Sequence, residues 1–195
     1  MSKFVLLAAV VICSVLVVPS FVRAEEEMTT AVAKPISVGL LIGFGTDLGD
    51  EFNPWGLGFG IQGGYNLERL YLGARFAYHI GSSFESGDVG GTVEASVSLW
   101  EFSAELGYDF PFEEKLTFRP SLLVGIATVV TSSDAPLFGE SVSGSDVNLL
   151  LSPGASLLYD INPDIFIGGD VRLPFVAGGG TMFGFVIYAN GGLHF

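Results

Sequence analysis

Apolar residues alternate with small or polar residues, at a period of two, in eight separate segments of this chain. The last segment, "FGFVIYANGGLHF", is mainly apolar at its odd positions, from Phe183 to Phe195, and small or polar at its even positions. A two-residue period places successive side chains on opposite faces of a β-strand. The sequence therefore predicts an all-β fold. The segments are residues 36–44, 55–66, 70–80, 92–110, 116–130, 147–160, 165–175 and 183–195.

Two features interrupt the alternation. In the fourth segment the apolar phase changes near Leu99–Trp100, and one extra residue there would make the two halves consistent, so we expect a β-bulge at this point. Pro120, Pro153 and Pro174 lie inside other segments. Since proline has no N–H to donate to a neighbouring strand, we expect bulges or strand ends at these positions.

The apolar face of these strands is predicted to contact lipid. It carries Phe, Leu, Ile and Val on every segment, whereas the opposite face is rich in the 27 glycines of the chain, which would cover a sheet poorly in water. A narrow barrel interior requires small residues with a few large polar ones. Connections that are short at one end and mostly longer at the other (46–54, 81–91 and 132–146) are typical of membrane barrels. We expect an eight-stranded antiparallel up-and-down transmembrane β-barrel.

Aromatic residues near the predicted strand ends are expected to form the two interfacial girdles of such a barrel. The alternative is that they fill a protein core. They are Phe44, Trp55, Tyr65, Tyr78, Tyr108, Tyr159, Phe175, Phe183 and Phe195.

The first 24 residues predict a secretory signal peptide. Lys3 precedes a 15-residue apolar run, and the segment ends in "FVRA" before "EEE". The run is short for a transmembrane helix, although an uncleaved anchor is the alternative. We expect a signal peptide at 1–24, a short N-terminal periplasmic segment at 25–35 and the barrel at 36–195. Cys13, the single cysteine, lies in the signal, so no disulfide or thiol chemistry is expected after cleavage.

The chain is strongly acidic. Cleavage would remove Lys3 and Arg23, leaving 6 basic and 21 acidic residues, and 6 − 21 gives a net charge of −15. This charge excludes nucleic acid as a partner, because phosphate contacts require a basic surface.

At this point the chain resembles the small outer-membrane β-barrel families of Gram-negative bacteria: the OmpA transmembrane domain, OmpX-like proteins and the "porin family" set. The resemblance covers about residues 36–195 and rests on the signal, the alternating segments and the terminal aromatic strand. It implies an integral outer-membrane protein, expected to be monomeric. Its implied partners are outer-membrane lipids, lipopolysaccharide and the barrel-assembly machinery, which would read Tyr188, Leu193 and Phe195 as an assembly signal.

The polar face predicts a charged interior network. Charges in a narrow interior must be paired, since an unpaired buried charge is costly. We expect Arg119 to lie near Glu105, Arg75 near Glu101, and Asp170 beside Arg172. Structural ion pairs are the main interpretation, and a polar path for protons or small ions is the alternative. The predicted network is Arg75, His79, Glu94, Glu101, Glu105, Arg119, Asp170 and Arg172.

No cofactor, metal or catalytic residue is predicted. The long connections carry acids without Lys or Arg, which indicates solvated surface or, alternatively, weak Ca²⁺ or Mg²⁺ binding that bridges to lipopolysaccharide. The "HIGSS" stretch at His79 is faintly similar to the His/Ser arrangement of lipid A deacylases, but without their spacing. We expect a non-enzymatic barrel with a role in envelope integrity or surface interaction. A narrow channel and a lipid-modifying enzyme are the alternatives.

Overall fold

The computed structural model describes residues 34–49, 53–88, 91–135, 140–178 and 180–195. For 84–88, 91–94, 133–135 and 140–143 it describes the backbone alone. The described residues belong to one compact unit, Val32–Phe195. The predicted signal peptide and nearly all of the predicted segment 25–35 lie outside them.

No helix among the described residues has the length and the apolar character needed to cross a membrane.

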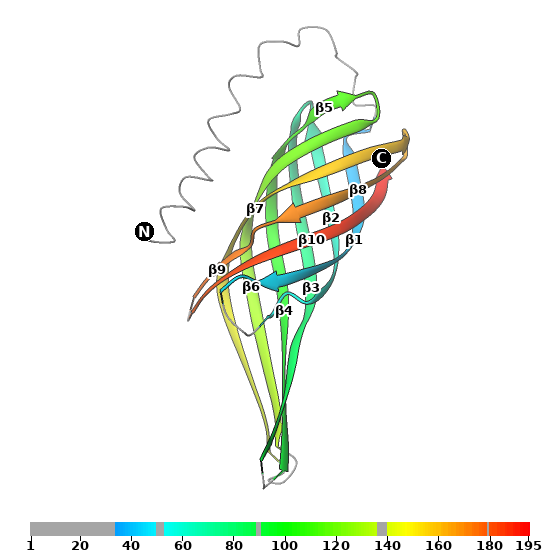
Figure 1. Cartoon of the computed structure of the whole chain (residues 1–195). Helices are drawn as coiled ribbons and strands as arrows, with labels where there is room; N and C mark the ends of the chain where they lie inside the picture. Colours follow the sequence, from blue (N-terminus) through cyan, green and yellow to red (C-terminus); the bar gives the residue numbers. More distant parts are fainter. Residues whose placement is uncertain (1–33, 50–52, 89–90, 136–139, 179) are drawn as a thin grey trace. The chain divides into compact units, whose positions relative to one another are not determined.

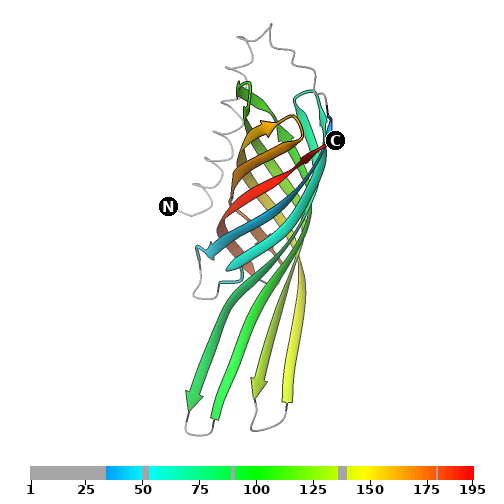
Figure 2. The same cartoon turned by 90° about the vertical axis from the view of Figure 1, so that its right-hand side faces the viewer.

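The described strands form a closed antiparallel barrel (Figures 1 and 2). β5 continues β4 after Asp109, and β9 continues β8 after Leu173 and Pro174, so the ten strands make eight staves. β1 pairs with β10 and β6 pairs with β7, which closes the ring. The strands are β1 (Ile36–Asp47), β2 (Leu57–Leu67), β3 (Leu70–Asp88), β4 (Gly91–Tyr108), β5 (Phe110–Glu113), β6 (Leu116–Ala135), β7 (Glu140–Asn162), β8 (Ile165–Arg172), β9 (Phe175–Ala177) and β10 (Thr181–His194).

Four strands continue well beyond the barrel wall, as Figure 2 shows most clearly. β3 last pairs with β2 at Ile80, and β7 first pairs with β9 at Leu149. Beyond these points β3, β4, β6 and β7 remain paired with one another as an open sheet, which we call the protruding sheet. Most of the predicted long connections 81–91 and 132–146 is therefore strand rather than loop.

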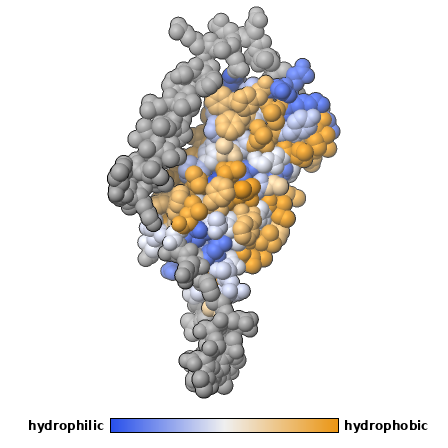
Figure 3. Space-filling model, viewed as in Figure 1, coloured by the Kyte–Doolittle hydropathy of each residue, from blue (hydrophilic) through white to orange (hydrophobic). Residues whose placement is uncertain are grey.

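The alternation separates two environments. Large apolar side chains on the outer wall are exposed, among them Leu40 (68%), Phe44 (63%) and Phe102 (60%), whereas their chain neighbours point inward and are buried or half-buried. Figure 3 shows the apolar surface over the barrel. An exposed apolar surface of this extent is stable in lipid rather than in water. The backbone groups are meanwhile satisfied within the closed ring.

The predicted bulge at Leu99–Trp100 is wrong. β4 pairs with β6 in continuous register from Glu94 to Gly107, and the irregularity lies in β3, between Ile80 and Ser83. Val97 and Leu99 are buried inside the barrel, while Trp100 faces out. The change of apolar phase reflects apolar residues that enter the interior, not an inserted residue.

The expected disruption at Pro120 and Pro153 is present on one side of each: β6 and β7 continue through them, but the ladder to a neighbouring strand stops beside each proline. Pro120 lies in continuous register on the β7 side, and on its other side the β4 ladder ends opposite Ser121. The carbonyl of Pro153 accepts a hydrogen bond from Leu173 N, where β8 ends. Neither position requires the missing N–H. Pro174 lies between β8 and β9, at the strand end that was expected.

Candidate functional site

The interior of the barrel is the candidate site. Inward residues of β3 mark three successive positions along it. These residues, Tyr71, Arg75 and His79, are all buried and follow one another at four-residue intervals, about 13 Å apart along the strand. Each belongs to a different layer of contacts. We call these layers the turn-side layer, the central cluster and the outer plug.

The turn-side layer is an ion pair stacked on an aromatic ring. Arg119 Nε contacts Asp109 Oδ1 at 2.5 Å, and Arg119 Nη2 contacts Asp109 Oδ2 at 2.8 Å. The same guanidinium lies 3.7 Å from the centroid of the Tyr71 ring and donates to Asn66 Oδ1. A planar guanidinium suits this combination of bidentate pairing and stacking. Arg119 therefore pairs with Asp109, whereas the sequence had predicted Glu105 as its neighbour.

The central cluster contains two arginines and two carboxylates. Asp170 accepts from Arg75 Nη1 at 3.1 Å and from Arg172 Nε at 2.8 Å. Glu105 contacts Arg172 Nη2 at 2.5 Å, and its second oxygen lies 3.8 Å from Arg75 Nη2. All four side chains are at most 2% exposed, so the formal charges balance within a buried space.

Hydroxyl and amide groups add hydrogen bonds to the central cluster, although Arg75 Nε and Arg172 Nη1 are buried without a partner among the described residues. Ser156 Oγ donates to Asp170 at 2.6 Å, Ser121 Oγ donates to Glu105 at 2.7 Å, and Arg75 Nη2 donates to Gln62 Oε1 at 2.9 Å. A buried ion pair is more stable when such additional hydrogen bonds satisfy its remaining polar atoms.

The expected pairing of Arg75 with Glu101 is wrong, while that of Asp170 with Arg172 is present. Arg75 lies on β3 and Asp170 on β8, and three other strands separate these two in the ring. Their side chains meet across the lumen. Sequence reasoning considered only neighbouring strands, and so it missed a contact that requires the closed ring.

The outer plug fills the opposite end with apolar side chains. Trp55 is fully buried at its centre, although a place in the lipid-facing girdle was expected. The "NPW" turn before β2 folds inward instead: the Asn53 side chain accepts from the N–H groups of Asp47 and Trp55. Pro54 in this turn is the signal that the alternation does not extend to Trp55. The cluster comprises Leu41, Trp55, Leu99, Ala127, Leu150, Val176, Val186 and Tyr188.

Polar groups lie within the plug. Trp55 Nε1 donates to Glu101 Oε1 at 3.1 Å, and His79 Nε2 is 3.9 Å from the same carboxylate. His79 Nδ1 lies 3.1 Å from the Trp55 carbonyl, and its Nε2 lies 2.8 Å from Tyr188 Oη. Both ring nitrogens are thus occupied by Trp55 and Tyr188, and the Ser82 hydroxyl accepts from Asn53 N. This geometry does not place His79 as a base for a serine.

Inward glycines make room for the large rings. A Cβ at Gly43 would lie 2.5 Å from Tyr188, and one at Gly64 would lie 2.5 Å from Tyr71. The Tyr71 and Tyr188 rings therefore occupy the space beside these glycines.

The other predicted residues lie as follows. Glu94 belongs to β4, but its side chain is outside those described. Of the predicted assembly signal, Leu193 and Phe195 face outward, with 46% and 57% exposure, while Tyr188 is inside. Among the side chains described, no three His, Cys, Asp or Glu residues gather as metal ligands, and Asp50 and Glu51 lie outside the described residues.

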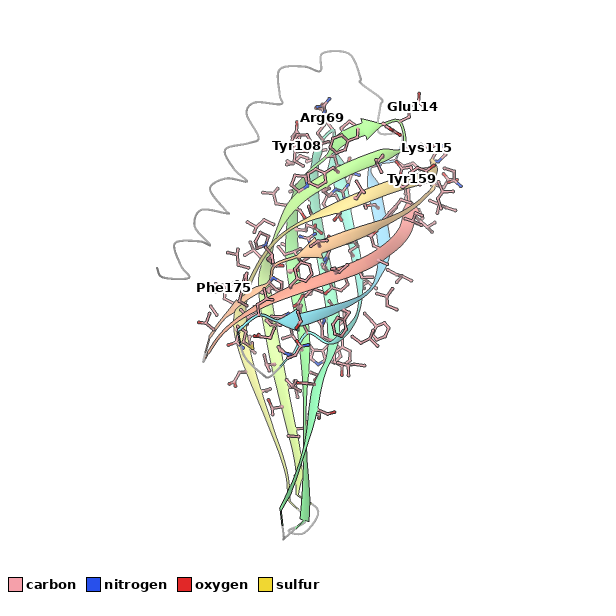
Figure 4. The ribbon with its side chains drawn as sticks, viewed as in Figure 1. Arg69, Tyr108, Glu114, Lys115, Tyr159 and Phe175 are labelled. Carbon is pink, nitrogen blue, oxygen red and sulfur yellow. The ribbon has the colours of Figure 1, made fainter. Side chains whose placement is uncertain are left out.

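The basic residues outside the interior gather at one rim. Arg69, Glu114 and Lys115 lie at the end with the tight turns, near Tyr108 and Tyr159, while Phe175 lies towards the opposite end (Figure 4). All Lys and Arg residues after position 33 belong to this end or to the interior: Lys34, Arg69, Arg75, Lys115, Arg119 and Arg172.

Comparison with known proteins identifies the architecture. The family model described as outer membrane protein beta-barrel domain matches residues 6–186. The chain is similar in structure to Ail, the attachment invasion locus protein of Yersinia pestis, with 18% identity, a TM-score of 0.54, and coverage of 83% of this chain and 97% of Ail. No curated protein matched the sequence.

Two further solved structures are similar. Neisserial surface protein A has 14% identity, a TM-score of 0.53, and coverage of 82% of this chain and 96% of that protein. A major outer membrane protein from Thermus thermophilus has 13% identity, a TM-score of 0.59, and coverage of 84% of this chain and 100% of that protein. At these identities the likeness establishes the shared fold.

Proposed function

Because the chain belongs to the outer membrane protein β-barrel domain family, we propose that it is a non-enzymatic surface-interaction protein with a closed interior. It is an integral protein of the Gram-negative outer membrane, and its working surface is the protruding sheet. The observation that carries this proposal is the continuation of β3, β4, β6 and β7 beyond the barrel wall.

Two other observations support it. The interior holds two layers of paired charges beneath an apolar plug, and such a filled lumen opposes conduction through a barrel of eight staves. Among the similar structures, one is named an attachment invasion locus protein and another a surface protein. In outer-membrane barrels the tight turns face the periplasm, and this rule supports a position of the protruding sheet outside the cell.

Cysteine labelling on intact cells tests the orientation. Cys13 is the only cysteine and lies in the predicted signal, so Ser145→Cys and Glu114→Cys introduce single reactive thiols into the barrel region. A membrane-impermeant maleimide should label Ser145→Cys on intact cells and Glu114→Cys only after permeabilisation. The reverse pattern would refute an external protruding sheet.

Planar-bilayer recording tests the closed interior. The wild-type barrel should give no discrete conductance steps. A variant that lacks the plug, Trp55→Ala with Leu99→Ala, provides the matched comparison, because both side chains are fully buried in the plug. Regular steps from the wild-type protein would favour the narrow channel instead.

A further inference from the structure

Among the described residues the protruding sheet has two edges that pair with no further strand, and they are not equivalent. On β3 the edge begins with the irregularity between Ile80 and Ser83, and the Ser82 N–H is bonded to the Asn53 carbonyl. A bulge and a covering contact are the usual devices that block an edge. β7 pairs with β6 in unbroken register from Glu140 to Tyr159, and its edge from 140 to 148 contains no proline and no lysine. β7 is the open edge.

The direction of the free backbone groups on β7 follows from its other bonds. Pro153 O accepts from Leu173 N on the β8 side, and Asp160 N donates to Lys115 O on the β6 side. N–H and C=O of one residue point to the same side of an antiparallel strand, and the sides alternate along the chain. Odd-numbered residues therefore face away from β6, which places the N–H groups of Ser141, Ser143, Ser145 and Val147 along the free edge.

The end of β7 has no buried face over the residues whose side chains are described. Residues 144–147 (Gly144, Ser145, Asp146 and Val147) are all exposed, and the space beside Gly144 is open. A strand without a buried face does not specify its pairing strongly and accepts a further strand readily.

The charge of the protruding sheet selects the partner. Its strands carry Glu85, Asp88, Glu94, Asp134, Glu140 and Asp146 and have no Lys or Arg. The register brings Glu85, Glu94 and Asp134 into one row across β3, β4 and β6. Like charges directly opposite one another destabilise a sheet, so a cationic partner would relieve this row.

We propose that the free β7 edge, residues 140–147, adds an extended segment of a basic polypeptide as a fifth strand of the protruding sheet. This inference rests on the proposed function, since it requires the sheet to lie outside the cell. Backbone hydrogen bonds to the odd-numbered residues supply the affinity, and lysine or arginine side chains match the acidic sheet. A structure of the similar protein Ail contains sucrose octasulfate, a polyanion. The acidic protruding sheet of this chain would instead favour a cationic ligand.

Peptide binding to the full barrel in nanodiscs tests the proposal. A labelled peptide of alternating lysine and threonine should bind, and a glutamate–threonine peptide and sucrose octasulfate should not. A lysine–proline peptide of equal charge should bind more weakly, because proline cannot complete a strand ladder. Equal binding of the lysine–proline peptide, or preference for either anion, would overturn the proposal.

Two matched variants separate the edge from general charge. Ser145→Pro removes an N–H that faces the free edge and should weaken binding about fivefold or more, whereas Ser145→Ala keeps that N–H and should bind as wild type. Asp146→Asn should weaken binding and reduce its dependence on salt. If Ser145→Pro and Ser145→Ala bind alike, the contact is diffuse electrostatic attraction and the edge has no role.

Hydrogen exchange in the wild-type protein requires no variant. The lysine–threonine peptide should slow exchange of the amides of Ser143 and Ser145 and leave those of β3 at 83–88 unchanged. Protection of the β3 amides alone would contradict the proposal, because the peptide would then pair with the β3 edge. Failure of these tests with correct thiol labelling and no conductance rejects the β7 proposal only, whereas inverted labelling rejects the proposed function itself.

Discussion

The indole N–H of Trp55 donates a hydrogen bond to Glu101 Oε1, 3.1 Å away, with both side chains buried inside the barrel. Trp55 belongs to the turn before β2, and Glu101 belongs to β4. This bond fastens the inward-folded connection to the wall on the far side of β3. It joins the apolar plug to a carboxylate that has no arginine partner among the ion pairs described.

Removal of this bond should destabilise the barrel. Trp55→Phe keeps a ring in the plug but leaves the buried carboxylate without its indole donor, which should cost about 1–3 kcal/mol of unfolding free energy. Trp100→Phe is the control, because Trp100 is 43% exposed on the outer wall. Urea titration followed by heat-modifiable gel mobility measures both. Equal stability of Trp55→Phe and wild type would show that the bond contributes nothing.

The two tryptophans should report different surroundings. Trp100 faces lipid beside Phe76 and Tyr78, whereas Trp55 is 0% exposed. In vesicles of brominated lipid, the fluorescence of the Trp55→Phe variant, which retains Trp100, should be strongly quenched. The Trp100→Phe variant, which retains Trp55, should be quenched little. Similar quenching of both would place Trp55 in the girdle and remove the plug.

Neutralisation of Asp170 should be the most damaging single change in the central cluster. Asp170→Asn leaves Arg75 and Arg172 in a buried space with a single carboxylate, Glu105, and should cost about 3–5 kcal/mol. Asp164→Asn removes an exposed pair with Lys34 and should cost at most about 1 kcal/mol. The same urea titration compares them. A smaller loss for Asp170→Asn than for Asp164→Asn would contradict the ion-pair layer.

Replacement of glycines by alanine tests how tightly the space around Trp55 is packed. A Cβ at Gly184 would lie 2.8 Å from the Trp55 ring, so Gly184→Ala should cost about 1–3 kcal/mol through overpacking. At Gly191 the nearest atom would be 3.7 Å away, and Gly191→Ala should stay within about 0.5 kcal/mol of wild type. Both glycines lie on β10, so the pair separates crowding from strand propensity. Equal effects would argue that Trp55 shifts freely.

The fold was predictable from the local pattern, because successive side chains of a strand point to opposite faces and so alternate between the two environments. Each of the eight predicted segments forms a stave, and residues such as Leu40, Phe102 and Ile167 face outward as the alternation indicates. The position of each charged residue in the alternation of its own strand likewise placed Arg75, Glu105, Asp170 and Arg172 on the inner face. Only the Asp170–Arg172 pair was predictable in detail, since its two members are two residues apart on one strand.

Closure of the ring decided the rest. It brings β3 opposite β8, so that Arg75 meets Asp170 across the lumen, and no local pattern encodes that distance. It also creates the interior volume that Trp55, Val97 and Leu99 fill, which is why they depart from the expected outward side. Alternation along a strand determines which solvent each face contacts. The contacts of the inward side chains depend on the diameter and stagger of the barrel, which exist only in the tertiary structure.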